Sequence, residues 1–363
     1  MVSSTVALGL TVATLVAFTG VGVWFSRGRV GSVEDLISAR DSTGSRRTTA
    51  TLVASVMGVW VLFSAPEAGA SFGIAAVVGY AVGEAVPMLV YARLGPRIRE
   101  LIPEGHSLTE YAHARYGTAM YAFVLLVSAL YMFIFLAAEL TGIAGALSLV
   151  AGVPQWQTAL LVGGFVLLYT GYGGLRASIA TDAVQAVVVI PLLLLAFVGA
   201  LVALGGPAAA IDGITATNPG LLDLGAVAGL QFGLALAFAI LGAELINQTW
   251  WQRIYAADSS ETVGRSFRTA ALANGAIVFV TAFFGVVAVG NAAVVTDPAS
   301  AGYNADAAFF VLLGEAFPEW LVLAAVLLAL LLVVSTAFLT PPGWGLSPWL
   351  VVALRCVSIA IPA

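Results

Sequence analysis

Long apolar runs recur along the whole chain and alternate with short polar segments. A hydrocarbon layer of ~30 Å needs roughly 20 helical residues, because each residue adds ~1.5 Å. The pattern predicts nine spans: 4–25, 50–73, 74–92, 118–150, 157–174, 180–205, 224–250, 269–293 and 319–340. Residues 348–363 are also apolar, but this segment is short for a span.

Composition agrees with this pattern. Hydrophobic residues make up 61% of the 363 residues and charged residues 9%, with a mean hydropathy of +1.02. A water-soluble domain carries roughly 25% charged residues. We therefore expect an all-α polytopic membrane protein, with the lipid bilayer as a partner and no nucleic acid.

The arginines assign the two sides of the membrane. Thirteen of the fourteen basic residues lie in alternate loops: Arg27, Arg29, Arg40, Arg46, Arg47, Arg93, Arg97, Arg99, Arg115, Arg176, Arg253, Arg265 and Arg268. The intervening loops, 151–156, 206–223 and 294–318, contain acidic residues and no basic one. Short cytoplasmic loops carry the excess of Lys and Arg. The charges predict a multi-pass plasma-membrane protein with its N-terminus outside the cytoplasm.

Several chemistries are excluded or unsupported. The sequence contains no Lys, so it cannot form a P-loop, whose Lys contacts the phosphates. His106 and His113 have no partners at a metal-ligand spacing, and Gly171 to Gly174 lack the strand that a dinucleotide fingerprint follows. We expect no enzyme activity and no cofactor.

Acidic residues at membrane depth indicate function. Glu67, Glu84, Glu139 and Glu244 fall within spans, and Asp182 lies at the cytoplasmic mouth of the sixth span. A charge at mid-helix costs ~2.5 to 3.5 kcal/mol on insertion scales. Such residues usually face a protein interior or a transport pathway. The alternative is that some are neutral or lie nearer the interface.

Two spans contain sequence that disturbs helices. The second includes Gly58 and Pro66, and the seventh includes Gly242 followed by the polar run from Asn247 to Arg253. Broken helices expose carbonyls at mid-bilayer, where transporters bind ions and solutes. The two spans are five apart, which indicates an inverted repeat of five plus five helices behind one extra helix.

Four motifs in order resemble the sodium:solute symporter family. They are Ser32 to Arg40, His106 to Gly117, Tyr169 to Ala177 followed by Thr181-Asp182 and Gln185, and Gln248 to Ala257. The resemblance covers about residues 20–337. It implies a leucine-transporter-like core with one extra N-terminal helix, residues 1–25, a first repeat in 50–205 and an incomplete second repeat in 224–340.

The resemblance also implies a Na⁺ site between the second and ninth spans. Carried onto this sequence, Ala54, Met57 and Leu332 offer carbonyls, and Ser335 and Thr336 offer hydroxyls. Oxygen ligands suit a hard cation, a rule stated for Ca²⁺ and Mg²⁺ that we extend to Na⁺. The alternative for Ser335 and Thr336 is helix packing by small polar residues.

For the solute, the broken seventh span offers Asn247, Gln248 and Trp250, with Trp60 opposite. Amides can hydrogen-bond a neutral solute and a Trp can stack on it; the alternative for both aromatics is core or lipid-interface packing. Asp182 resembles a family Asp near the inner ion exit, and the alternative is a helix N-cap. The polar run resembles the urea transporter branch, although the sugar branch shares its Asn-Gln pair.

The expected function is Na⁺-coupled symport of a small organic solute such as urea, proline or a sugar. The alternatives are a permease subunit of an ATP-driven transporter and an inactive symporter remnant. The sequence departs from the family after Ala337, and residues 341–363 form an atypical apolar tail. We hypothesise a truncated or frameshifted reading frame, which sequencing would contradict if no frame continued the family pattern.

Overall fold

The computed structural model describes residues 3–28 and 39–336 of the chain, and within these ranges it is helical without a strand. In chain order the helices are α1 (Ser4–Ser26), α3 (Ser45–Val56), η1 (Val59–Leu62), α4 (Ser64–Leu101), α5 (Leu108–Tyr116), α6 (Thr118–Ala151), α7 (Gln155–Ala203), α8 (Pro207–Thr217), η2 (Pro219–Leu222), α9 (Val227–Leu245), α10 (Gln248–Ala256), α11 (Ser260–Asn291), η3 (Ala305–Ala307), α12 (Ala308–Ala316) and α13 (Glu319–Thr336).

Six helical segments in the described part of the chain are long and apolar enough to cross a membrane. They are Ser4–Ser26, Ser64–Leu101, Thr118–Ala151, Gly174–Ala203, Val227–Leu245 and Ser260–Asn291. These segments confirm a multi-pass protein. The other three expected spans are shorter or interrupted. The span 50–73 is divided among α3, η1 and the start of α4, the span 157–174 overlaps the short apolar helix Gln155–Leu168, and 319–340 contains Glu319–Val333. Residues 341–363 lie outside the described residues.

Two long helices change direction at a glycine. Gly73 interrupts α4 with φ 72°, and Gly174 interrupts α7 with φ 55°. This left-handed region is accessible to glycine because it has no Cβ. The breaks coincide with the expected ends of the second and fifth spans, so each merged helix consists of two predicted segments.

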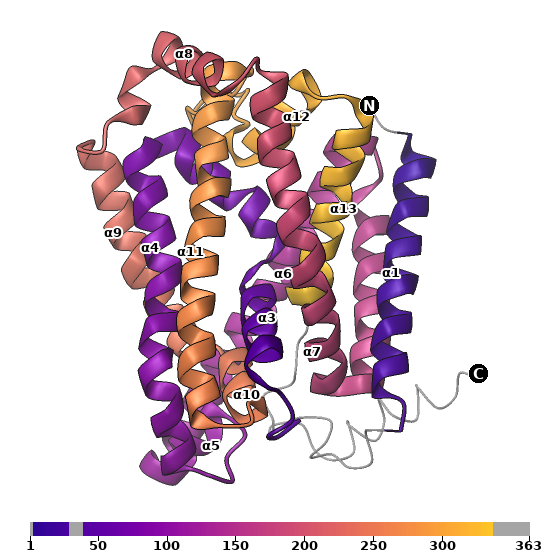
Figure 1. The fold of residues 1–363 in the computed structure, drawn as a ribbon, viewed down its shortest axis with the longest axis vertical. Helices are drawn as coiled ribbons and strands as arrows, with labels where there is room; N and C mark the ends of the chain where they lie inside the picture. The colour runs from indigo at the N-terminus through magenta and orange to yellow at the C-terminus, as the bar shows by residue number, and fades with distance from the viewer. Residues whose placement is uncertain (1–2, 29–38, 337–363) are drawn as a thin grey trace.

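The helices form an upright bundle with two distinct ends (Figure 1). The start of α1, α8 and α12 lie at one end, and α5 and α10 lie at the other. The C-terminal ends of α1 and α4 lie there with α10, and these segments carry Arg27, Arg99 and Arg253. We call this second end the arginine end. The alternate-loop pattern of the sequence therefore corresponds to one end of the folded bundle.

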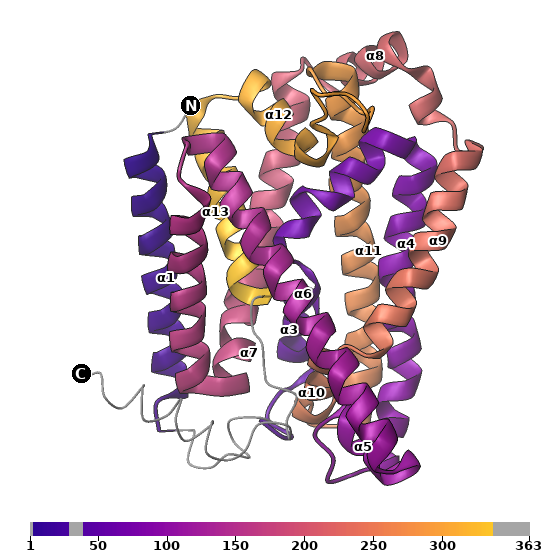
Figure 2. The same ribbon diagram turned by 180° about the vertical axis from the view of Figure 1, so that it is seen from behind.

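The bundle surrounds a pair of interrupted helices. On one side α4 packs along α11 and α9, and on the other α1, α7 and α13 pack together (Figure 2). Rings of α4 and α11 stack across their contact, with Tyr91 and Phe267 centroids 5.6 Å apart. The short helix α3 lies between the two sides and contacts α7, α11 and α13.

Both predicted helix breaks are present. The chain is extended at Gly58, between α3 and η1, and irregular at Ile246 and Asn247, between α9 and α10. The first break lies nearer the chain start than Pro66, which sits in the first turn of α4. A proline is tolerated there because first-turn amides have no partner inside the helix. Pro66 therefore begins α4 and does not break it.

Candidate functional site

A cavity of about 170 Å³ lies between the two helix breaks. It is lined by Ser55, Val56, Trp60, Tyr80, Glu84, Tyr131, Phe135, Ile240, Ala243, Glu244 and Asn247. These residues come from α3, η1, α4, α6, α9 and the second break. We call this space the central cavity. Four aromatic side chains and two carboxylates dominate its walls.

Glu244 is held in place by the protein. Its carboxylate accepts a hydrogen bond of 2.9 Å from the Tyr131 hydroxyl and another of 2.9 Å from Nδ2 of Asn247. Asn247 also caps α10, since its Oδ1 accepts the amide of Thr249 at 2.9 Å. The second break therefore positions one carboxylate of the cavity.

Glu84 has a different environment. Its side chain is 7% exposed, and no hydrogen bond or ion pair joins it to the rest of the described chain. Its ionisable neighbours are Glu244, Tyr80 and Tyr131. Tyr80 in turn stacks on Trp60 with centroids 5.6 Å apart and planes 16° apart. Two acidic groups thus face one small aromatic space.

Two of the four predicted solute residues line the central cavity. These are Trp60 and Asn247. Gln248 instead bonds the chain before α5, with its Nε2 donating to the His106 carbonyl at 3.2 Å and its Oε1 accepting the Leu108 amide at 3.1 Å. The ring of Trp250 is buried between neighbouring helices. Sequence reasoning did not assign Tyr131 or Phe135 to the site.

A second, much smaller cavity lies beside the first break. It measures about 10 Å³ and is lined by Ala54, Met57, Gln185, Ala186, Val189, Leu331 and Leu332. This is close to the ~10 to 15 Å³ that one water-sized particle needs. The structure thus brings together Ala54, Met57 and Leu332 from the predicted Na⁺ site. The helix α13 continues one turn further to Ser335 and Thr336, whose side chains lie outside the description.

Gln185 is the polar side chain at this small cavity. It is 1% exposed, its Nε2 donates to the Leu331 carbonyl at 2.9 Å, and its Oε1 is buried without a hydrogen-bond partner among the described residues. A buried unsatisfied oxygen is costly unless a ligand fills the place of the partner. The signal in the sequence was the place of Gln185 in the third family motif, near the start of the predicted span 180–205.

Asp182 forms a fully buried ion pair with Arg253. Arg253 donates from its guanidinium to the Asp182 carboxylate at 2.9 Å and to the Ser178 hydroxyl at 3.2 Å. The hydroxyl of Thr51 in α3 also donates to Asp182. Thr51 lies one turn before the residues at the first break. The pair and its hydrogen bonds therefore join α3, α7 and α10.

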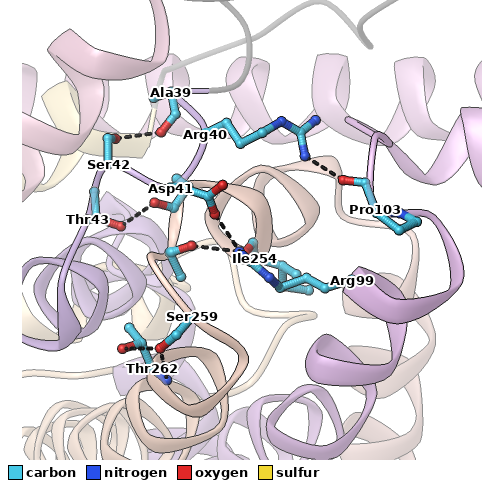
Figure 3. Close-up of polar contacts among 12 residues, drawn as sticks. Ala39, Arg40, Asp41, Ser42, Thr43, Arg99, Pro103, Ile254, Ser259 and Thr262 are labelled. Atoms are coloured by element: carbon cyan, nitrogen blue, oxygen red, sulfur yellow. Dashed lines mark hydrogen bonds and ion pairs between the residues drawn. The ribbon is translucent and has the colours of Figure 1, made fainter.

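A second layer of hydrogen bonds covers the arginine end. Arg99, at the end of α4, donates to the Ile254 carbonyl at 2.9 Å and pairs with Asp41 at 2.6 Å, while Arg40 donates to the Pro103 carbonyl at 2.7 Å. Figure 3 shows these side chains joining the loop before α3 to α4 and α10. Guanidinium groups therefore bridge three segments at this end of the bundle.

The remaining acidic residues predicted at membrane depth support the helix starts. Glu139 accepts the Val59 amide at 2.7 Å, at the first break. Glu67, in the first turn of α4, accepts a hydrogen bond from the hydroxyl of Tyr303. Tyr303 lies in the loop before η3, and burial followed by the bond to Glu67 raises its pKa to about 12. These two carboxylates have structural partners.

Comparisons with known proteins agree on a transporter fold. Over 91% of this chain and 70% of the other, the structure resembles a substrate-bound, outward-open Na⁺-coupled sialic acid symporter, with a TM-score of 0.74 and 18% identity. At that identity the likeness shows the fold, which is leucine-transporter-like as expected. The division of the chain into two repeats stays a prediction.

Curated relatives are named as transporters. The chain is 28% identical over 308 residues to a spermidine transporter of Candida albicans, covering 85% of this chain and 57% of the relative. It is 25% identical to a probable urea active transporter of Schizosaccharomyces pombe, covering 52% and 29%, and 27% identical to a sodium/pantothenate symporter of Escherichia coli, covering 58% and 45%. The chain thus spans about half the length of these relatives, or less.

A family model supplies the broadest match. It extends over residues 37–341, which include both helix breaks, both cavities and the buried ion pair. This match agrees with the fold that the structural likeness shows. The chain belongs to the sodium:solute symporter family.

Proposed function

We propose that this protein couples the entry of Na⁺ to the uptake of a small organic solute by alternating access. It spans the plasma membrane with its arginine end in the cytoplasm and its N-terminus outside, as the distribution of basic residues favours. One observation carries the proposal. Ala54 and Met57 line the small cavity, whereas Ser55 and Val56, the residues between them, line the central cavity.

This interleaving supports coupling. A cation bound by the carbonyls of Ala54 and Met57 fixes the chain at the break, and the same stretch forms a wall of the central cavity. Ion binding therefore orders the solute site before the solute arrives, which lowers the free-energy cost of binding it. Solute binding strengthens ion binding by the same factor, since coupling between sites is reciprocal.

The ion site draws its ligands from three helices. The carbonyls of Ala54, Met57 and Leu332 and the hydroxyls of Ser335 and Thr336 form the set implied by the family. The orphan Oε1 of Gln185 supplies a further oxygen from α7. An all-oxygen set suits a hard cation, and the small cavity suits a single ion. The metal at this site is Na⁺ only.

The arginine end serves as the inner gate. The pair between Asp182 and Arg253 and the contacts of Arg99 close the route from both cavities to that end. Release into the cytoplasm requires α3 to move away from α7 and α10, and this movement separates Asp182 from Thr51 and Arg253. Asp182 therefore belongs to gating and ion exit.

For the solute, the central cavity selects a small molecule. The relatives of this chain are named as transporters of spermidine, urea and pantothenate. A cavity of about 170 Å³ is close in size to the ~150 Å³ cavity that accepts benzene, so it holds about six non-hydrogen atoms. Trp60 and Asn247 contact the solute in this arrangement, and Gln248 and Trp250 position the break around it.

Uptake into reconstituted vesicles tests the proposal. The full chain is placed in proteoliposomes and offered radiolabelled urea, proline, glucose, pantothenate and spermidine, with an inward Na⁺ gradient or with K⁺ replacing Na⁺. We expect uptake of one solute that requires the Na⁺ gradient. An inside-negative potential should accelerate it, because a cation crossing 100 mV gains ~2.3 kcal/mol. Uptake driven by ATP alone, or none with any solute, would contradict the proposal.

A further inference from the structure

The central cavity carries more negative charge than a neutral solute needs. Glu84 and Glu244 both line it, no arginine does among the described lining residues, and the sequence has no lysine. Two carboxylates sharing a desolvated space disfavour each other's charged form, and a cation bound between them offsets this repulsion. The cavity is therefore complementary to positive charge. We infer that its solute is an organic cation, an alkylammonium with one or two amine groups, which is a proposal that rests on the proposed function.

Glu84 is the observation that points to a ligand. Its side chain is more than nine-tenths buried and lines the cavity, yet no described residue donates a hydrogen bond to it. Glu244, in contrast, accepts hydrogen bonds from Tyr131 and Asn247. Buried carboxylates in proteins are normally paired. An ammonium N–H donor placed in the cavity supplies the missing partner of Glu84.

The walls distinguish an organic cation from an inorganic one. Trp60, Tyr80, Tyr131 and Phe135 line the cavity, and ammonium groups bind favourably over aromatic faces. A bare Na⁺ ion requires a tight cage of oxygen atoms, as hard cations do. The central cavity has about 170 Å³, against about 10 Å³ for the small cavity. The larger space fits a molecule of about six non-hydrogen atoms.

Equilibrium binding to the purified full-length protein tests this inference. The probe is radiolabelled butane-1,4-diamine, measured in NaCl, and the competitor of matched length and shape is neutral butane-1,4-diol. We expect the diamine to bind saturably and the diol to compete at least a hundredfold more weakly. Urea, which is neutral, should also fail to compete. Competition by the diol or urea at concentrations similar to the diamine would overturn the inference.

Substitution of Glu84 tests whether the diamine binds in the central cavity. Glu84→Gln keeps the shape of the side chain and removes its charge, and we expect the affinity for the diamine to fall at least tenfold. Glu261→Gln removes a carboxylate that is 83% exposed at the start of α11 and should leave the affinity unchanged. Elution of each variant as a single species in size-exclusion chromatography checks that it is folded. Unchanged diamine affinity in folded Glu84→Gln would overturn the inference.

Two measurements separate this inference from the proposed function. If Na⁺-driven uptake of a neutral solute is found and the diamine does not bind, the inference fails and the function stands. If the diamine binds in a Glu84-dependent manner but no solute follows the Na⁺ gradient, the function fails and the inference stands. If Glu84→Gln changes the affinity for ²²Na⁺ and not for the diamine, Glu84 binds the inorganic ion and the inference is overturned.

Discussion

Two buried carboxylates, Asp182 and Glu84, lie within the same bundle in opposite circumstances. Asp182 is paired with Arg253 and accepts a hydrogen bond from Thr51, so the protein itself neutralises its charge. Glu84 is surrounded by aromatic side chains and another acidic residue and has no such partner in the described chain. The first links three helices, and the second lines a cavity. A buried charge that the protein has satisfied indicates structure, whereas one that it has not satisfied indicates a ligand.

The largest effect should follow from removing the partner of Asp182. Arg253→Met leaves a buried carboxylate without compensation, which costs about 3 to 5 kcal/mol. We expect a much lower apparent Tm in detergent, followed by the fluorescence of the protein on heating.

A double variant separates charge from packing. Asp182→Asn together with Arg253→Met removes both charges and should recover most of the lost stability. Arg265→Met breaks an ion pair on the surface and should change the stability by less than about 1 kcal/mol. If Arg253→Met behaved like Arg265→Met, the buried pair would not hold the arginine end together.

Substitution of Glu84 should raise the stability of the protein, whereas Arg253→Met should lower it. Without solute, Glu84→Gln removes a buried carboxyl group that has no hydrogen-bond partner in the described chain, and we expect it to stabilise the protein by about 1 to 3 kcal/mol. The measurement is the apparent Tm in the absence of any added solute. Glu244→Gln is the matched comparison, because its new amide would face the donors of Tyr131 and Asn247 and should destabilise the protein. Equal shifts for the two variants would remove the distinction between them.

Substitution of Gln185 should lower the affinity for Na⁺ and leave the affinity for the solute unchanged. Gln185→Leu removes the buried oxygen at the small cavity, and we expect the Na⁺ concentration for half-maximal binding to rise about tenfold, which corresponds to ~1.4 kcal/mol. Binding of ²²Na⁺ to purified protein measures this directly. Gln155→Leu, at the exposed first residue of the same helix, is the control. An unchanged affinity would exclude Gln185 from the ion site.

We expect the smallest change in stability from a substitution at the end of the bundle opposite the arginine end. Tyr303→Phe removes the hydrogen bond to Glu67, and we expect a loss of about 1 kcal/mol in stability. The pKa of Tyr303 is raised from 10.0 to about 12, so its contribution is complete below pH 10 and disappears as the pH rises through about 12. Thermal unfolding at pH 7 and pH 9 should show the same difference between variant and parent. A difference that already vanished at pH 9 would contradict this assignment.

Much of the fold was predictable from hydropathy and from helix-disturbing residues. Apolar length identified the long spans because a bilayer imposes a minimum length on a helix. Glycine and the polar run from Asn247 located both breaks. Pro66 was misleading, since a proline in the first turn of a helix does no damage and the chain becomes extended earlier, at Gly58.

The site was less predictable, because a residue type does not reveal its neighbours. Asn247 and Trp60 line the central cavity as expected, but Gln248 satisfies the backbone near His106 and Leu108. Trp250 is 2% exposed and packs on Tyr91, with centroids 5.2 Å apart. These contacts join residues about 140 to 160 positions apart, and no local pattern encodes them.

The walls contributed by α6 were not predictable for a different reason. This helix is apolar on all sides, so its sequence does not indicate which face meets the cavity. Tyr131 and Phe135 are four residues apart and therefore share one face. Only the packing of α6 against the two breaks shows that this face is the inner one.

The short helix α3 has one further consequence, which concerns leakage. Thr51 contacts Asp182, Ala54 lines the small cavity and Ser55 lines the central cavity, all in the last two turns of a helix of 12 residues. Met57, the residue after this helix, also lines the small cavity. A segment this short moves as one piece, so ion and solute should be released in the same step. A substitution that makes α3 pliable, such as Val53→Gly, should let Na⁺ slip through without cargo and dissipate the gradient that uptake consumes.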